Sequence, residues 1–126
     1  MLQIDTNGNI LVNQGDTFEI PLILKNVDKL FDTTPITFKA KDIINLHVMA
    51  PNMPYECPII EKSITCSEET TADKLKFTFE HTDTCALFPE TYFYEIKLQR
   101  QNEEVDENPC DDYYKTLTGK RKFILI

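Results

Sequence analysis

The stretch Thr91–Arg100, TYFYEIKLQR, alternates between large apolar side chains and mostly polar ones along its whole length. Successive side chains of a β-strand point to opposite faces, so this alternation predicts a strand with one buried and one wet face. Such strands are typical of antiparallel sheets, which pack one face on the core. The side chains predicted to point inward are those of Tyr92, Tyr94, Ile96 and Leu98.

The same period of two recurs on both sides of this stretch. Candidate strands lie at 17–24, 36–40, 42–50, 57–64, 74–80 and 120–126, and an N-terminal hairpin is predicted from 2–4 and 10–12 around a two-residue Asn7-Gly8 turn. Within 42–50, the alternation places His47 and Met49 on the outward face. The pattern breaks at 81–89, which fits one helical turn capped by Asp83 or Thr84.

Seven to nine short strands without an ordinary helix predict an all-β protein. The spacing favours an antiparallel immunoglobulin-like β-sandwich, with a small β-barrel as the alternative. A chain of 126 residues is the usual size of one domain, so residues 1–126 are expected to form a single β-sandwich domain.

The charge of the chain is concentrated in one segment. The 13 basic and 21 acidic residues give a net charge of −8, and the stretch 101–112 holds six acidic residues and no basic one. This stretch is predicted to be an acidic loop, with calcium binding by its carboxylates left open. The acidic balance argues against a nucleic-acid partner, because phosphate binding needs clustered Lys and Arg. No apolar run is long enough for a membrane span, so no membrane partner is expected.

The sequence contains no recognisable catalytic or cofactor motif. The two serines, Ser63 and Ser67, lie outside any nucleophile elbow, and three dispersed glycines cannot form a phosphate-binding loop. We therefore predict no catalytic residue, no enzyme activity and no cofactor. The four cysteines are Cys57, Cys66, Cys85 and Cys110, without CxxC spacing, so no metal site is predicted. Free thiols are favoured over two disulfides, because no signal peptide is visible.

Three stretches together resemble a known family. They are ILVNQGDTFEI at 10–20; FTF at 77–79 followed by Asp83-Thr84, Leu87, Phe88-Pro89, Thr91-Tyr92 and Tyr94-Glu95-Ile96; and GKRKFI at 119–124. In this order they are similar to the N-terminal domain of phage baseplate upper proteins and to related small tail or virion domains. The structural motif residues are Gly15, Asp16, Thr17, Phe18, Asp83, Thr84, Pro89, Tyr92 and Tyr94. Glu90 stands where such domains commonly have glycine.

The resemblance implies a non-enzymatic structural protein of the virion, made in the host bacterial cytoplasm. Such a baseplate or tail adaptor would act through contacts with other phage tail or virion proteins, in a homo-oligomer or multi-copy assembly. Outward apolar side chains are what a sheet offers to partners, so Ile23, Met49 and Phe93 are predicted to make these contacts.

Two other functions remain open at the level of sequence. A carbohydrate-binding β-sandwich would stack sugar rings on exposed aromatic side chains, for which Tyr55, Phe93, Tyr113 and Tyr114 are candidates. A secreted bacterial immunoglobulin-like domain would instead pair all four cysteines in two disulfides.

Overall fold

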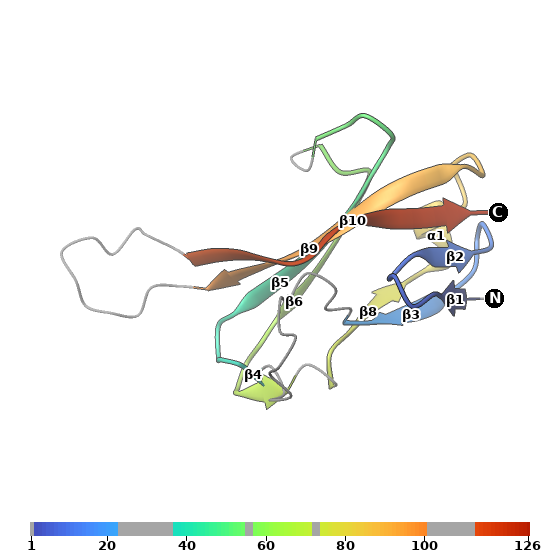
Figure 1. The fold of residues 1–126 in the computed structure, drawn as a ribbon. Coiled ribbons are helices and arrows are strands. Elements are labelled where there is room, and N and C mark those ends of the chain that lie inside the picture. The colour runs from blue at the N-terminus through green and yellow to red at the C-terminus, as the bar shows by residue number, and fades with distance from the viewer. Residues whose placement is uncertain (1, 23–36, 55–56, 72–73, 101–112) are drawn as a thin grey trace.

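In the part of the chain that the structure describes, the regular elements are β-strands and one short helix (Figure 1). The structure, a computed structural model, describes residues 2–22, 37–54, 57–71, 74–100 and 113–126. The strands in these ranges are β1 (Leu2–Ile4), β2 (Ile10–Val12), β3 (Phe18–Pro21), β4 (Thr37–Phe38), β5 (Ile43–Met49), β6 (Ile60–Thr65), β7 (Thr70–Thr71), β8 (Lys76–Phe79), β9 (Thr91–Arg100) and β10 (Tyr113–Leu125). The helix is α1 (His81–Thr84).

Six of the strands form one curled sheet that resembles half of a barrel. Its strand order is β1-β2-β10-β9-β5-β6, while β3 pairs with β8 and β4 pairs with β7 in two smaller sheets. The prediction of an antiparallel arrangement was wrong at one place, because β2 and β10 run parallel. The β1–β2 hairpin folds back on itself, which brings β2 beside the last strand in the same direction. The described residues contain ten strands where seven to nine were predicted, and two of these have only two residues each.

The N-terminal hairpin is confirmed, but its turn differs from the predicted one. The backbone N–H of Gly8 donates to Asp5 O at 3.1 Å, and the N–H of Asp5 donates to Asn9 O at 3.0 Å. Gly8 has a φ of 85°. This is a three-residue connection in which glycine occupies the left-handed position after a tight turn. The Asp5 carboxylate accepts bonds from the N–H groups of Asn7 and Asn9, which stabilises the longer loop.

The core lies between the six-stranded sheet and the β3–β8 pair. The inward side chains of β9 predicted from the alternation are all buried, as are Phe18, Ile20, Phe77 and Phe79. The rings of Phe18 and Phe79 stack with centroids 4.8 Å apart, and Phe123 of β10 lies 6.4 Å and 5.9 Å from them. Aromatic burial therefore joins the two sheets.

The last strand is longer than its sequence pattern indicated. The alternation predicts a strand over 120–126, whereas β10 begins at Tyr113 and pairs with β9 along most of its length. Its register shifts between Thr116 and Thr118 and again between Thr118 and Arg121. Each bulge inserts an extra residue and interrupts the period of two, which is why the first half of β10 does not read as a strand.

An ion pair with a buried carboxylate joins the start of β5 to the end of β9, which we call the far end of the sheet. Asp42, which precedes β5, is 1% exposed and accepts from Arg100 Nη2 at 2.8 Å and from Arg100 Nε at 3.0 Å. The same carboxylate accepts from the backbone N–H of Lys39 at 2.8 Å. The far end of the sheet therefore depends on a charged contact. The charge of Asp42 also affects the buried Cys66 thiol, whose pKa is raised by burial and, to a smaller extent, by this carboxylate.

Candidate functional site

The first motif turn, Asn13–Asp16, is shaped by a glycine. The N–H of Asp16 donates to Asn13 O at 3.2 Å, which closes a four-residue turn with Gly15 in its third position. Gly15 has a φ of +80°, as a type II turn requires at that position. Thr17 follows the turn, and β3 begins at Phe18, whose side chain is buried. A glycine adopts this left-handed backbone without the steric cost that a side chain brings.

The second motif segment forms the corner between β8 and β9. The predicted helical turn is present as α1, but its cap is Glu80 and not Asp83 or Thr84. Asp83 lies in the third helical position, where Oδ2 accepts from the backbone N–H of Glu80 at 2.7 Å. The prediction placed the start of the helix too late, because Glu80 also belongs to the alternating pattern of β8. Asp83 therefore acts as the second half of a capping box.

Asp83 also forms an ion pair with Lys62 of β6. Lys62 Nζ lies 2.7 Å from Asp83 Oδ2 and 5.2 Å from the centroid of the Phe79 ring. Burial acts to raise the pKa of Asp83, but the bonds from Lys62 and the Glu80 backbone outweigh it and lower the pKa below its ordinary value. The carboxylate is therefore stabilised as an anion that positions the corner.

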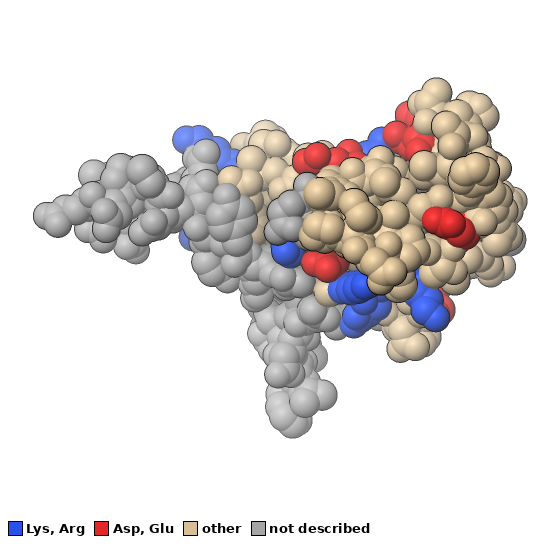
Figure 2. All heavy atoms as spheres, turned by 90° about the horizontal axis from the view of Figure 1, so that it is seen from above, with Lys and Arg blue, Asp and Glu red and all other residues tan. Residues whose placement is uncertain are grey.

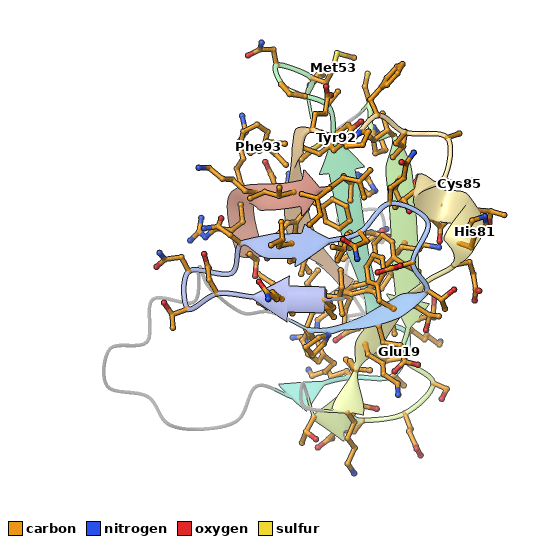
Figure 3. All side chains as sticks on the ribbon, turned by 90° about the vertical axis from the view of Figure 1, so that its right-hand side faces the viewer. Glu19, Met53, His81, Cys85, Tyr92 and Phe93 are labelled. Atoms are coloured by element: carbon orange, nitrogen blue, oxygen red, sulfur yellow. The ribbon has the colours of Figure 1, made fainter. Side chains whose placement is uncertain are left out.

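The two motif segments, about seventy residues apart in sequence, meet in space. The backbone N–H of Gly15 donates to Thr84 Oγ1 at 2.8 Å, and the Thr84 side chain is fully buried. His81 Nδ1 lies 2.7 Å from Gly15 O, so Nδ1 carries the proton and donates to this carbonyl. We call this contact, between the 13–16 turn and the 80–92 corner, the corner clasp; His81 and Cys85 mark its helical side in Figure 3.

A glutamine side chain extends the corner clasp along the loop after α1. Gln14 Nε2 donates to Cys85 O at 2.9 Å and to Leu87 O at 2.6 Å. The backbone N–H of Gln14 donates to Ile126 O at 2.8 Å, next to the end of β10. Gln14 and His81 were not among the predicted site residues. Gln14 lies in the QGDTF stretch, but no sequence pattern indicates which distant carbonyls its amide will reach.

The two motif tyrosines bond backbone carbonyls from the buried face of β9. Tyr92 Oη donates to Phe88 O at 2.8 Å, across the corner, and Tyr94 Oη donates to Gly8 O in the N-terminal hairpin. Burial raises the pKa of both phenols, and the charge of Glu90 adds to the effect at Tyr92. Pro89, between Phe88 and β9, is exposed. These contacts leave both phenols protonated and structural.

The predicted partner contacts have different environments. Met49 is only 2% exposed, so its prediction as an exposed side chain was wrong, and His47 is likewise buried. Both lie on β5, a central strand that pairs with β6 on one side and with β9 on the other. Phe93 is half-buried, and Lys120 Nζ lies 4.3 Å from the centroid of its ring. Ile23 lies outside the described residues.

The remaining sequence predictions concern thiols, metals and charge. Cys57, Cys66 and Cys85 are free thiols, which contradicts a domain held by two disulfides, since these would need all four cysteines. Within the described ranges, no three His, Cys, Asp or Glu side chains gather to hold a metal ion. The predicted acidic loop at 101–112, with its calcium hypothesis, falls outside those ranges.

The described surface mixes charges of both signs. Figure 2 shows acidic and basic side chains interspersed among uncharged ones on the face seen from above. No helix in the described part of the chain is long and apolar enough to cross a membrane. Of the aromatic residues considered for stacking on sugars, Tyr55 lies outside the described residues, as do the side chains of Tyr113 and Tyr114.

Comparison of the chain with models of protein families, with curated proteins and with solved structures finds no match.

Proposed function

We propose that this chain is a non-enzymatic structural protein of a phage virion, a baseplate or tail adaptor domain that acts through protein contacts. In this proposal its fold is an immunoglobulin-like sandwich. The strand order supports the fold: β1-β2-β10-β9-β5-β6 forms one sheet and β3-β8 packs against it, with the last strand beside β2. In immunoglobulin-like sandwiches of seven strands, a tyrosine near the start of the sixth strand bonds a backbone group just upstream. Tyr92, near the start of β9, makes the corresponding bond to Phe88 O.

The observation that carries the proposed function is the corner clasp. The stretches that resemble the phage family, 10–20 and 77–96, bond to each other through Gly15 and Thr84. If the two stretches belong to one family motif that shapes the domain, their residues should contact each other in the fold. Two stretches that resembled the family by chance would not need to be in contact. The resemblance and the clasp therefore support the same assignment.

The non-enzymatic part of the proposal rests on how the polar groups of the clasp are used. His81 donates to a backbone carbonyl, Thr84 accepts from a backbone N–H, and Asp83 binds Lys62 and the helix start. A general base or nucleophile needs its reactive atom directed at a substrate. Here these atoms hold the backbone, which fits an adaptor.

The test is binding to the proteins encoded beside its gene. Each adjacent tail, fibre or capsid product is co-expressed with this chain, and the complexes are measured by size-exclusion chromatography with light scattering. We expect a stoichiometric complex with at least one neighbour, or a defined homo-oligomer. A chain that stays monomeric at high concentration and binds no neighbouring product would rule the proposal out.

A further inference from the structure

One aromatic side chain at the corner is left almost entirely in water. Phe88 is 80% exposed, against 50% for Ile126, 48% for Met53 and 41% for Ile59, the other exposed large apolar side chains of the described residues. Single exposed apolar residues are common on protein surfaces. Phe88 therefore needs a further feature before it indicates a contact, and its backbone supplies one.

Three hydrogen bonds fix the backbone around Phe88. Gln14 Nε2 donates to the carbonyl of the preceding residue, Leu87, at 2.6 Å. Tyr92 Oη donates to the carbonyl of Phe88 itself at 2.8 Å, and the N–H of Leu125 donates to Glu90 O at 3.0 Å. Binding costs less when the contact residue is already ordered. The corner thus presents the phenyl ring on a fixed backbone.

A neighbouring apolar residue enlarges this surface, because Pro89 follows Phe88 directly and is exposed. We call Phe88 and Pro89 the apolar end patch. An exposed carboxylate, Glu90, follows Pro89 directly and borders the patch. The patch is therefore apolar at its centre and acidic at one margin.

We propose that the apolar end patch is the anchor by which this domain docks on a different protein, one with an apolar pocket for Phe88 and a basic residue at the rim of that pocket. The proposal rests on the proposed adaptor function and names its contact surface. A buried aromatic anchor with a charged rim is the usual arrangement of energetically dominant interface residues. The rigid presentation of Phe88 and the charge of Glu90 select this partner chemistry.

A second copy of the chain fits the patch less well. In a two-fold contact each residue meets the same surface on its partner, so two Phe88 rings at the axis would bring two Glu90 carboxylates together. Like charges facing each other across an interface weaken association. The geometry thus favours a heterologous partner over a homodimer through this patch.

The experiment uses the full chain and the proteins encoded beside its gene as probes. Dissociation constants are measured by calorimetry for the parent chain, Phe88→Ala, Phe88→Leu and Glu90→Lys. We expect Phe88→Ala to weaken binding about tenfold or more, while Phe88→Leu keeps most of the affinity. Glu90→Lys should weaken it about threefold or more, and less at high salt. The matched control Glu19→Lys reverses an exposed charge on β3 and should leave the affinity unchanged.

The outcomes separate this inference from the adaptor function. If a neighbouring protein binds and Phe88→Ala changes its affinity less than about twofold, the patch is not the anchor, while the adaptor function stands. If Glu90→Lys binds as tightly as the parent chain or more tightly, the partner has no basic residue at the rim of its pocket, and that part of the proposal is wrong. Self-association abolished by Phe88→Ala would make the occupant a second copy and overturn the proposal. If no neighbour binds, both proposals fail. An unchanged melting temperature verifies that each variant is folded.

Discussion

The two ends of the six-stranded sheet are held together by different chemistry. At the corner clasp, uncharged groups dominate: Gly15 N–H donates to Thr84 Oγ1, and the Gln14 amide donates to two carbonyls. At the far end, the buried carboxylate of Asp42 is matched by Arg100. A neutral hydrogen bond contributes about 1 kcal/mol of net stability, whereas a buried charge that loses its partner costs several times more. The far end should thus be the more vulnerable to a single substitution.

The difference also concerns what each end exposes. The corner clasp satisfies its backbone groups internally and leaves Phe88 in water. Its helix α1 lies at the end of the molecule where both termini lie (Figure 1). The Asp42–Arg100 pair buries its carboxylate and joins the ends of β5 and β9. The first arrangement presents a side chain outward, and the second fastens strands. This contrast leads us to place binding at the corner and stability at the far end.

The largest expected effect is at the far end. Arg100→Met removes the guanidinium from Asp42 and leaves a buried carboxylate with its bond from the Lys39 N–H. We expect a loss of about 2 to 3 kcal/mol in the free energy of unfolding, below the range for a wholly buried pair because Arg100 keeps 29% of its side chain exposed. Urea denaturation measures it.

A double variant provides the control for this substitution. Asp42→Asn in the Arg100→Met background removes the orphaned charge, so the double variant should be more stable than Arg100→Met alone. If the single variant loses no more than an ordinary surface substitution, the contrast between the two ends is wrong.

A smaller effect is expected at the clasp. Gly15→Ala places a Cβ at 3.2 Å and 3.3 Å from ring atoms of His81, at a φ of +80° that side-chain-bearing residues rarely adopt. We expect a loss of about 2 kcal/mol, read from the shift in the urea midpoint. Because His81→Ala by itself removes the bond from Nδ1 to Gly15 O, Gly15→Ala is also measured in a His81→Ala background, where its cost should fall by the steric part and keep the backbone part. If Gly15→Ala costs nothing in that background, alanine bears no backbone strain at this φ.

Strands were predictable where their alternation is uninterrupted. Thr91–Arg100 was predicted with its exact bounds, because period two alone specifies a half-buried strand. The first half of β10 was not, because its bulges shift the side chains between faces. Alternation also specifies which face a side chain takes but not whether neighbours cover that face, which is why Met49 is buried despite its outward position.

The clasp was predictable only in part. The resemblance singled out Gly15 and Thr84, and the positive φ of Gly15 follows from its turn. Their contact, across 69 positions of sequence, depends on the antiparallel pairing of β3 with β8, which aligns Phe18 with Phe79 and so brings the residues before β3 beside those after β8. Phe88 shows the same limit, since an apolar residue in a broken pattern can be a core residue or an exposed one. Only the fold decides between them.

The smallest effect concerns the charged contact beside the corner clasp, Lys62 with Asp83. The pKa of Asp83 is lowered in the folded state from an ordinary value of 3.8, so this group stabilises the fold above that pH and loses its contribution as the pH falls through the lowered value. Asp83→Asn should therefore cost about 1 kcal/mol at neutral pH, and its difference from the parent should shrink below about pH 4. Chemical denaturation at several pH values measures this. Glu19→Gln, which alters the exposed Lys76–Glu19 pair, is the control and should show little difference at any pH. If the stability difference between Asp83→Asn and the parent stays constant down to pH 2, the charge of Asp83 does not stabilise the contact with Lys62. The corner would then be stabilised by uncharged groups alone, and the contrast with the charged far end would be sharper.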